Sequence, residues 1–491
     1  MATASGAFTT VGRKALGWGL RGLSRSPRLR TAVFGMHERY LRATSGRDPR
    51  HPPAVGADRM AMGLALAHLV ERALAEDRLS DAALCGLVQR LVGDVVLQHG
   101  DRTPHERFRR RHGSSPPDFL TIAPGKTCNL RCTGCYAAAG PTPEKLDWGT
   151  LDRLVTEAHD GWGVQFFVLS GGEPFAYHDD GKGILDLAER HPECFFLSYT
   201  NGTLITDEVA RRLAAVGNLS PGLSIEGMRE RTDARRGAGV FEKVLAAADR
   251  MRAAKVVFGL SLTATRENSE EILSDEVLDL FVEQKGALYA WVFHYMPIGR
   301  APSLDLMLTP EQRVRLHERV WHLVRDRRLF IADFWNSGTA TCGCVAGGRA
   351  GGYLYVDWNG AVCPCVFVPY SPVNLKDAYA AGRTLDDVWS ERLFARVRAW
   401  QRAYGYRESG ETYDGGGNWL MPCLIRDHHR DFRRILAETR PQPTDAAAGD
   451  ALEDAAYAQG LEAFDARLSE LTQPLWEARY QGRPRTGKDQ P

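Results

Sequence analysis

Three features are scarce in this sequence, and each scarcity excludes a class of protein. No stretch reaches the roughly 18 uninterrupted apolar residues of a membrane-spanning helix, so no spanning segment is predicted. Ten cysteines among 491 residues are too few for a disulfide-stapled secreted scaffold. The formal net charge is only +1, so no nucleic-acid partner is predicted. The remaining composition is that of an ordinary globular protein, and the length predicts two or three domains.

Acidic residues are absent from the first 37 positions, whereas six of these positions hold Arg or Lys. Basic residues and leucines fall on opposite faces of a helix drawn through this segment: Lys14, Arg21, Arg25 and Arg28 against Leu16, Leu20 and Leu23. The pattern is typical of an interfacial helix, and a solvated basic tail or an organellar transit peptide has the same composition. We expect a basic N-terminal segment at residues 1–46, with peripheral membrane contact through residues 1–37 as one hypothesis.

The central part of the chain alternates between two patterns. After a breaker-rich linker at 47–56 and a helical region at 57–118, whose last part (101–118) is predicted to be a charged connector, six apolar runs alternate with six helical stretches. The runs lie at 119–123, 165–169, 195–199, 222–225, 256–263 and 288–295. This order predicts an α/β fold, a partial (β/α)6 TIM-like barrel over residues 119–330. Functional loops are then expected at the carboxyl ends of the strands.

The C-terminal part is predicted to be a small Cys-rich extension at 336–430. It holds a hairpin formed by 352–358 and 361–368, which turns at Asn359-Gly360. The tail at 431–491 is predicted to contain an acidic helix near 445–480 and a disordered end.

The first group of cysteines follows directly on the first predicted strand. Glycines in the loop allow the thiolates of Cys128, Cys132 and Cys135 to converge on one metal site. A four-iron cluster normally takes four cysteine ligands, so three leave one iron open to a non-protein ligand. Zinc is the main alternative, but C-x3-C-x2-C lacks the paired C-x2-C spacing of zinc ribbons and fingers.

The segment Cys128–Tyr136 resembles the cluster loop of the radical S-adenosylmethionine (SAM) superfamily. The resemblance implies a [4Fe–4S] cluster on the three cysteines, whose open iron chelates the amino and carboxylate groups of SAM. In that family the position before the third cysteine is commonly aromatic and packs near the adenine. Here it is Gly134, and Tyr136 is the expected substitute.

The end of the second predicted strand carries a further resemblance. Gly171-Gly172-Glu173-Pro174 resembles the G-G-E-P motif of the superfamily, whose backbone meets the SAM amino group. A plain glycine-rich turn is the alternative.

Two later strand ends add candidate SAM contacts. Ser224-Ile225-Glu226-Gly227 resembles the family's S-I-[DE]-G strand, which implies that Ser224 and Glu226 lie by SAM or the substrate. A carboxylate suits a ribose diol because it can accept two hydrogen bonds. Arg236 resembles the family's R-G step and is a candidate clamp for the SAM carboxylate. His294 and Tyr295, at the sixth strand end, either face the pocket or form a core-edge aromatic pair.

The second group of cysteines resembles the opening of SPASM and twitch extensions, which carry auxiliary [4Fe–4S] clusters. From Cys344, fifteen residues lead to Gly360 and four more to Cys365, whereas the usual SPASM close is absent. The resemblance implies one auxiliary cluster on Cys344, Cys365 and Cys423, with Cys342 or Cys363 as a candidate fourth ligand. Zinc competes for this site.

Together these motifs imply reductive cleavage of SAM to a 5′-deoxyadenosyl radical, which abstracts hydrogen from a substrate. A flavodoxin- or ferredoxin-type electron donor is implied, and reduced thiols suggest a cytoplasmic protein, with membrane association as an option. No catalytic side chain is assigned. Three hypotheses remain for the function: an enzyme acting on a peptide or small metabolite, an enzyme acting on a membrane lipid, and a non-catalytic iron–sulfur or zinc protein.

Overall fold

The computed structural model describes residues 26–44, 48–96 and 100–482. A ten-stranded sheet lies at its centre, in the order β11-β9-β8-β1-β2-β3-β4-β5-β6-β7. Seven consecutive strands are parallel: β1 Phe119–Ile122, β2 Phe166–Leu169, β3 Phe195–Thr200, β4 Leu219–Ile225, β5 Gly259–Ala264, β6 Tyr289–His294 and β7 Phe330–Asp333. The predicted α/β class and its six strands are confirmed, and β7 is a strand that the sequence pattern did not predict.

The parallel sheet is curled. The rings of Tyr199 on β3 and Phe293 on β6 have centroids 5.1 Å apart, whereas a flat sheet would separate these strands by about 14 Å. Alternation along each strand sends one set of side chains into this curl and the other toward the helices. On β1, for example, Thr121 faces the interior cavity, while Leu120 and Ile122 pack in the core.

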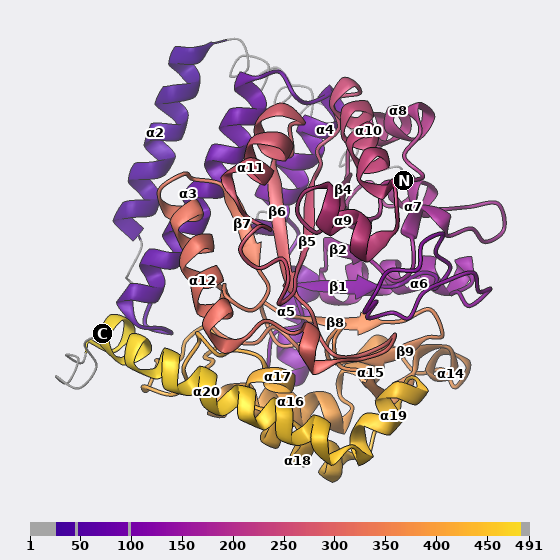
Figure 1. Cartoon of the computed structure of the whole chain (residues 1–491), viewed down its shortest axis with the longest axis vertical. Helices are drawn as coiled ribbons and strands as arrows, with labels where there is room; N and C mark the ends of the chain where they lie inside the picture. Colours follow the sequence, from indigo (N-terminus) through magenta and orange to yellow (C-terminus); the bar gives the residue numbers. More distant parts are fainter. Residues whose placement is uncertain (1–25, 45–47, 97–99, 483–491) are drawn as a thin grey trace.

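Helices cover the outer face of the curled sheet (Figure 1). They are α6 Trp148–Glu157, α7 Ile184–Arg190, α8 Asp207–Val216, α9 Arg229–Arg236, α10 Val240–Ala253, α11 Asp275–Leu278 and α12 Pro310–Arg325, with π-helical turns continuing α6 and α11. The helix starts follow capping chemistry. On α12, Thr309 accepts from the backbone N–H of Gln312, and the Gln312 side chain accepts from the N–H of Thr309.

The N-terminal region consists of α2 Pro27–Thr44, α3 Pro53–Ala75, α4 Asp81–Cys85 with the π-helical segment Gly86–Val96, and α5 Thr103–His112. The connector predicted at 101–118 is therefore wrong, because α5 occupies most of it. Phe108 anchors this charged helix, with its ring centroid 5.0 Å from that of Trp389. Pro53 begins α3 inside the predicted linker, since proline fits the first turn of a helix. The interfacial helix predicted before Pro27 lies outside the described residues.

The C-terminal region joins the barrel sheet. Strands β8 Tyr353–Val356 and β9 Ala361–Cys363 form the predicted hairpin, and β8 pairs in parallel with β1. The remaining elements are β10 Tyr370–Ser371, β11 Val373–Asn374, β12 Gln442–Pro443, and the helices α13 Gly338–Thr341, α14 Leu375–Ala380, α15 Leu385–Trp389, α16 Arg392–Ala403, α17 Leu424–Asp427, α18 His429–Thr439, α19 Ala446–Glu453 and α20 Ala455–Tyr480. Helix α20 runs along one edge of the molecule, beside α17 and α18 (Figure 1).

One buried carboxylate ties the N-terminal helices to the rest of the protein. Asp58 on α3 accepts hydrogen bonds from Arg325 (2.6 Å), Thr339 (2.8 Å) and Tyr480 (2.7 Å). These partners belong to α12, α13 and α20, so four helices meet at one side chain. Among the helices described, none is long and apolar enough to cross a membrane.

Candidate active site

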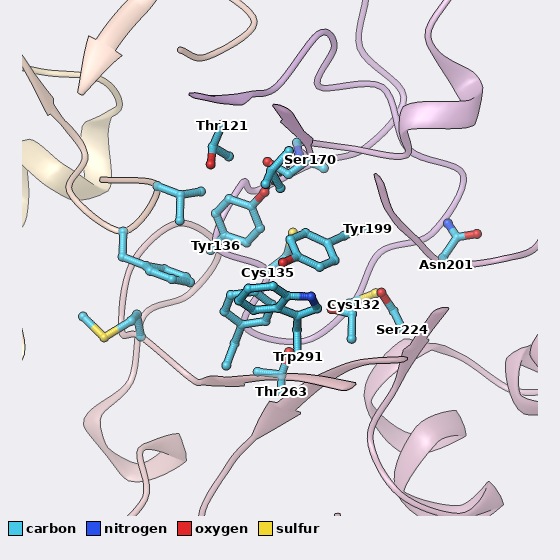
Figure 2. Close-up of a pocket in the computed structure, with 18 of the residues that line it drawn as sticks. Thr121, Cys132, Cys135, Tyr136, Ser170, Tyr199, Asn201, Ser224, Thr263 and Trp291 are labelled. Atoms are coloured by element: carbon cyan, nitrogen blue, oxygen red, sulfur yellow. Dashed lines mark hydrogen bonds between the residues drawn. The ribbon is translucent and has the colours of Figure 1, made fainter. Parts of the chain in front are cut away.

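A cavity of about 230 Å³ occupies the inside of the curled sheet and opens toward the carboxyl ends of the strands. In the view of Figure 2, Tyr136 and Ser170 lie above Trp291 and Thr263, and all of them line the cavity together with Cys132 and Cys135. The cavity also brings together the other predicted site residues that line it: Cys128, Gly171, Gly172, Glu173, Ser224, Arg236, His294 and Tyr295.

The cysteine loop is held by backbone contacts from two directions. The Cys128 N–H donates to the carbonyl of Gly140 (2.9 Å), and Arg300 donates to the carbonyls of Cys132 (2.9 Å) and Cys135 (3.0 Å). Arg300 follows β6, so the sixth strand end clamps the loop that follows the first.

The three loop thiols lie close to one another. Burial raises the pKa of Cys128 to about 11, and the nearby Glu173, Cys132 and Cys135 add to this rise. Among the described residues, no three His, Cys, Asp or Glu side chains are close enough to hold one metal ion. The thiolates of a four-iron cluster bind different irons, so the ligands of a cluster stand farther apart than those of a single ion.

The glycine-rich turn after β2 packs directly on the cysteine loop. A Cβ atom on Gly172 would lie 2.2 Å from the carbonyl oxygen of Thr127, so only glycine fits there. The Gly171 N–H donates to the hydroxyl of Tyr136 (3.0 Å). The sequence resemblance predicts that this turn meets SAM. What the structure places against these glycines is the loop itself.

The carboxylate of Glu173 is hydrogen-bonded to residues at the end of β3. It accepts from the hydroxyl of Thr200 (2.7 Å) and from the backbone N–H of Asn201 (2.7 Å). Burial raises its pKa, although these donors act in the opposite direction. The side chain therefore joins the turn after β2 to the strand beside it.

Glu226 and Arg236 are paired with each other. One oxygen of Glu226, Oε1, accepts from Arg236 Nε (2.8 Å) and from Arg235 Nη1 (2.6 Å). The other oxygen, Oε2, is buried and has no protein partner within the described structure. Burial lowers the pKa of Arg236, but Glu226 and the Cys132 thiol outweigh it and raise the pKa overall. A free acceptor beside a cation close to the cysteine loop suits a polar, zwitterionic ligand such as SAM.

Tyr295 fills the space beside Gly134. A Cβ atom on Gly134 would lie 2.5 Å from Cε2 of the Tyr295 ring, and Gly134 itself has a φ of +62°. The Tyr295 hydroxyl accepts from the Ser303 N–H (3.1 Å), which fixes the ring. An aromatic ring thus occupies the volume toward which an aromatic residue at 134 would point.

His294 lies in the cavity wall with both ring nitrogens engaged. Its Nε2 is 3.0 Å from Oδ2 of Asp333, and its Nδ1 is 3.0 Å from Nη2 of Arg426. Burial lowers the pKa of His294 to about 4, against the opposing effect of Asp333. Because arginine only donates, Nδ1 is the acceptor and Nε2 carries the proton. The residue is a neutral, fixed part of the wall.

Three thiols of the second cysteine group, those of Cys344, Cys365 and Cys423, act on one another electrostatically. Burial raises the pKa of Cys365 to about 12, and Cys344 adds to the rise. Burial also raises the pKa of Cys423, followed by Asp427, Cys344 and Cys365 as neighbours. The Tyr353 hydroxyl lies 3.0 Å from Sγ of Cys365, and Tyr353 also lines the cavity. Donors directed at sulfur suit a metal-bound thiolate.

Of the two candidate fourth ligands, Cys342 lies in other surroundings, whereas Cys363 is a neighbour of Cys365. Cys342 packs against Trp419 and accepts from Arg59 Nη1 (3.4 Å). Cys363 is buried on β9, near Asp357 and Cys365. The pKa effects therefore link Cys344, Cys365 and Cys423, and they link Cys363 to Cys365 as well.

Two parts of the site were missed by sequence reasoning. The aromatic wall includes Trp291 and Phe293, and the alternation along β6 (Tyr289, Trp291, Phe293) was a signal that could have found it. Arg426 gave no local signal, because its contact with His294 joins positions 132 residues apart.

A curled parallel sheet with a three-cysteine loop after its first strand defines a class of enzyme. The model of the radical SAM superfamily matches residues 122–275. The mycofactocin maturase MftC of Mycobacterium tuberculosis is 30% identical over 315 residues, which cover 61% of this chain and 76% of that protein. The chain therefore belongs to the radical SAM superfamily. It is an enzyme that uses a [4Fe–4S] cluster and SAM, and the non-catalytic hypothesis is set aside.

Two further proteins are similar to this chain. The AdoMet-dependent heme synthase of Methanosarcina barkeri is 24% identical over 360 residues, covering 67% of this chain and 93% of that protein. The crystal structure of Streptococcus suis SuiB bound to the precursor peptide SuiA aligns with a TM-score of 0.50 and 18% identity, over 68% of this chain and 83% of SuiB. The SuiB match supports the fold.

Proposed function

We propose that this enzyme is a peptide maturase that abstracts a hydrogen atom from an apolar carbon of its substrate. The supporting observation is the wall of the cavity opposite the cysteine loop, which is built from aromatic rings. They belong to Phe119, Phe166, Tyr199, Trp291, Phe293, Phe334, Tyr353 and Phe367. The few polar side chains among them include Thr121, Ser261 and Thr263.

Charge is confined to the loop end of the cavity. The charged side chains in its lining are Glu173, Arg235 and Arg236, and each is already paired within the protein. A charged substrate group pressed against the aromatic wall would lose its hydration without finding a partner, which is costly. An apolar side chain has no favourable hydration to lose when it packs against the aromatic wall, and its burial is favourable.

In this proposal, one set of residues binds the cluster and SAM, and another set contacts the substrate. Cys128, Cys132 and Cys135 would hold the cluster, and Glu226 with Arg236 would bind polar groups of SAM. Bound together, cluster and SAM supply a carbon-centred radical when an electron arrives. The aromatic wall excludes water from that radical and orients the substrate carbon toward it.

The relatives favour a peptide over a small metabolite. MftC is named a maturase, and SuiB was solved with a precursor peptide, whereas the heme synthase relative is named for a different kind of product. The electron donor that we propose is a flavodoxin or ferredoxin.

The decisive experiment follows deuterium. Peptides encoded by short reading frames beside the gene are synthesised with deuterated Val, Leu, Ile, Phe and Tyr side chains and incubated anaerobically with reconstituted enzyme, SAM and dithionite. We expect deuterium in 5′-deoxyadenosine. Transfer only from matched peptides deuterated at Ser, Asp, Glu and Lys would refute the apolar assignment. The variant Trp291→Glu should lose peptide-dependent transfer, and Trp291→Phe should keep it.

We also propose an auxiliary [4Fe–4S] cluster on Cys344, Cys365 and Cys423, with one iron open to another ligand. Iron is counted in the Cys128→Ala/Cys132→Ala/Cys135→Ala triple variant after anaerobic reconstitution. We expect about four irons per chain to remain. No iron, or one zinc in its place, overturns the auxiliary cluster.

A second candidate substrate is a membrane lipid. The observation that favours it is the outer face of α2, where Leu29 and Met36 are about half exposed and the exposed Arg28 and Arg39 lie nearby. Pelleting with phosphatidylglycerol vesicles tests this. If Leu29→Glu/Met36→Glu binds the vesicles as well as the wild type does, the lipid candidate fails.

A further inference from the structure

The hydroxyl group of Tyr353 on β8 connects the cavity wall with the second cysteine group. Its oxygen is 3.0 Å from Sγ of Cys365, and it accepts a hydrogen bond from the Val366 N–H (3.2 Å). Tyr353 and Val366 both line the cavity. Tyr353 is 1% exposed, so bulk solvent does not compete for its hydroxyl. The sulfur of Cys365 is therefore within hydrogen-bonding distance of a side chain that forms part of the cavity wall.

The ring of Tyr353 is held by two other aromatic rings. It stacks on Phe119 of β1 with a centroid distance of 4.8 Å and an interplanar angle of 14°. It meets Phe334 edge-on, with the centroids 6.1 Å apart. Both arrangements are favourable for aromatic pairs. The position of the hydroxyl oxygen is thus set by the packing of the ring, independently of its contact with sulfur.

The hydrogen bonds around the Tyr353 hydroxyl decide the direction of its proton. The oxygen already accepts from the Val366 N–H, so its single proton remains for another acceptor. Sγ of Cys365 also accepts from the Phe367 N–H (3.5 Å). Cysteine binds metal as a thiolate, which has no proton to donate, so the tyrosine is then the donor. A side chain and a backbone group would both donate to this one sulfur.

We propose that Tyr353 is a positioning residue that donates a hydrogen bond from the cavity wall to the Cys365 thiolate of the auxiliary cluster, and that this bond raises the reduction potential of the cluster. The inference rests on the auxiliary cluster proposed above. A hydrogen bond to a ligating sulfur stabilises negative charge and so favours the reduced state of the cluster. One side chain thus serves both the substrate cavity and the cluster.

The reduction potential of the auxiliary cluster tests this role. The Cys128→Ala/Cys132→Ala/Cys135→Ala triple variant isolates the auxiliary signal. Tyr353→Phe is added to it, because phenylalanine keeps the ring and removes the hydroxyl. Redox titration followed by electron paramagnetic resonance is the readout. We expect reduction to become about tenfold less favourable, a shift of about 59 mV to more negative potential for a one-electron couple. Iron should stay at about four per chain.

A second readout follows the proton of the hydrogen bond. After exchange of the triple variant into D2O, electron–nuclear double resonance of the reduced auxiliary cluster should detect deuterium near the cluster. This signal should decrease when Tyr353→Phe is added, because the hydroxyl deuteron is then missing. A tyrosine that only packs in the wall would change neither this signal nor the potential on losing its hydroxyl.

The matched control is Tyr406→Phe in the same triple variant. Tyr406 is also a buried tyrosine of the C-terminal region, but its hydroxyl donates to the carbonyl oxygen of Ala350 (2.8 Å). Its loss should leave the potential and the deuterium signal unchanged.

The possible outcomes separate this inference from the cluster on which it rests. If Tyr353→Phe keeps about four irons with the parent potential and deuterium signal, the role of Tyr353 is refuted while the cluster stands. Loss of iron from Tyr353→Phe, with Tyr406→Phe retaining it, would support the contact, because the thiolate would then depend on the hydroxyl. If the triple variant itself holds no iron, the auxiliary cluster fails and this inference with it.

Discussion

Two buried glutamates differ in how much hydrogen-bonding capacity they retain: Glu173 lines the cavity, whereas Glu226 is not among the lining residues but pairs with two of them, Arg235 and Arg236. Glu173 is used up by Thr200 and Asn201, whereas Glu226 keeps Oε2 free beside Arg236. The motif resemblance named both glutamates. The contacts of Glu173 lie on the neighbouring strand and were not predictable from the local sequence, whereas Glu226 pairs with Arg235 and Arg236 only nine and ten residues further along the chain.

At this scale the clearest prediction concerns Arg236. We expect Arg236→Met to weaken SAM binding roughly 10- to 100-fold, because a hydrogen bond to a charged group contributes about 1.5–3 kcal/mol. Equilibrium dialysis with labelled SAM under anaerobic conditions measures this. Arg229→Met is the control, since Arg229 lies on the same helix but pairs with Glu242 at the surface. Equal affinity of the two variants would contradict the assignment.

The turn after β2 and the cysteine loop meet so closely that Gly172 has no room for a side chain. We expect Gly172→Ala to lose the first cluster, because its methyl group would overlap the carbonyl of Thr127. Iron content should fall by about four per chain. Gly140→Ala, which changes a glycine of the cysteine loop itself, has nothing within 4 Å of its new Cβ, and this variant should keep its iron. Full iron content in Gly172→Ala would show that the loop can move aside.

The docking of α20 on α18 should depend on pH. Burial raises the pKa of Asp465 to about 8, although the His429 N–H opposes this. The folded state therefore holds this proton more tightly than the unfolded chain, so stability falls as pH rises from about 4 to about 8. The slope contributed by this group is at most about 1.4 kcal/mol per pH unit.

Urea unfolding of the wild type and Asp465→Asn at pH 5 and pH 8 measures this effect. We expect the variant to gain stability relative to the wild type at the higher pH. Parallel pH profiles for the two proteins would mean that Asp465 titrates normally.

Element prediction succeeded where a pattern is local. The runs that became β1 to β6 and the turn at Asn359-Gly360 were read from spacing alone. Strand β7 was missed because its four residues follow a long helix without an obvious turn signal. Helix α5 was missed because one buried residue, Phe108, holds an otherwise charged segment in place.

Asp58 on α3 links the N-terminal helices to α12, α13 and α20. We expect Asp58→Ala to cost about 3–5 kcal/mol, because it leaves the buried hydroxyls of Thr339 and Tyr480 and the half-buried Arg325 without their shared partner. The melting temperature of the holoenzyme measures this loss. Glu71→Ala, a more exposed position on the same helix, should change it little. A small effect of Asp58→Ala would mean that α3 is held by apolar packing alone.

Contacts between segments that lie far apart in the chain could not be predicted from local sequence patterns. The thiols of Cys344, Cys365 and Cys423 come from segments separated by twenty residues or more, and only the resemblance to a family spacing predicts them from the sequence. The contact of Arg426 with His294 and the aromatic lining of the cavity are visible only in the packed structure.

Because β8 pairs with β1, the chain cannot be cut between its two cysteine-bearing regions without exposing a strand edge. A fragment ending after residue 335 would leave β1 as a bare edge, with unpaired backbone groups open to other chains. The same cut would remove Tyr353, which stacks on Phe119 at 4.8 Å. The two cysteine-bearing regions are thus not interchangeable modules: gene truncations and domain fusions made at their boundary should yield aggregates, and only exchanges that carry β8 with its barrel should remain soluble.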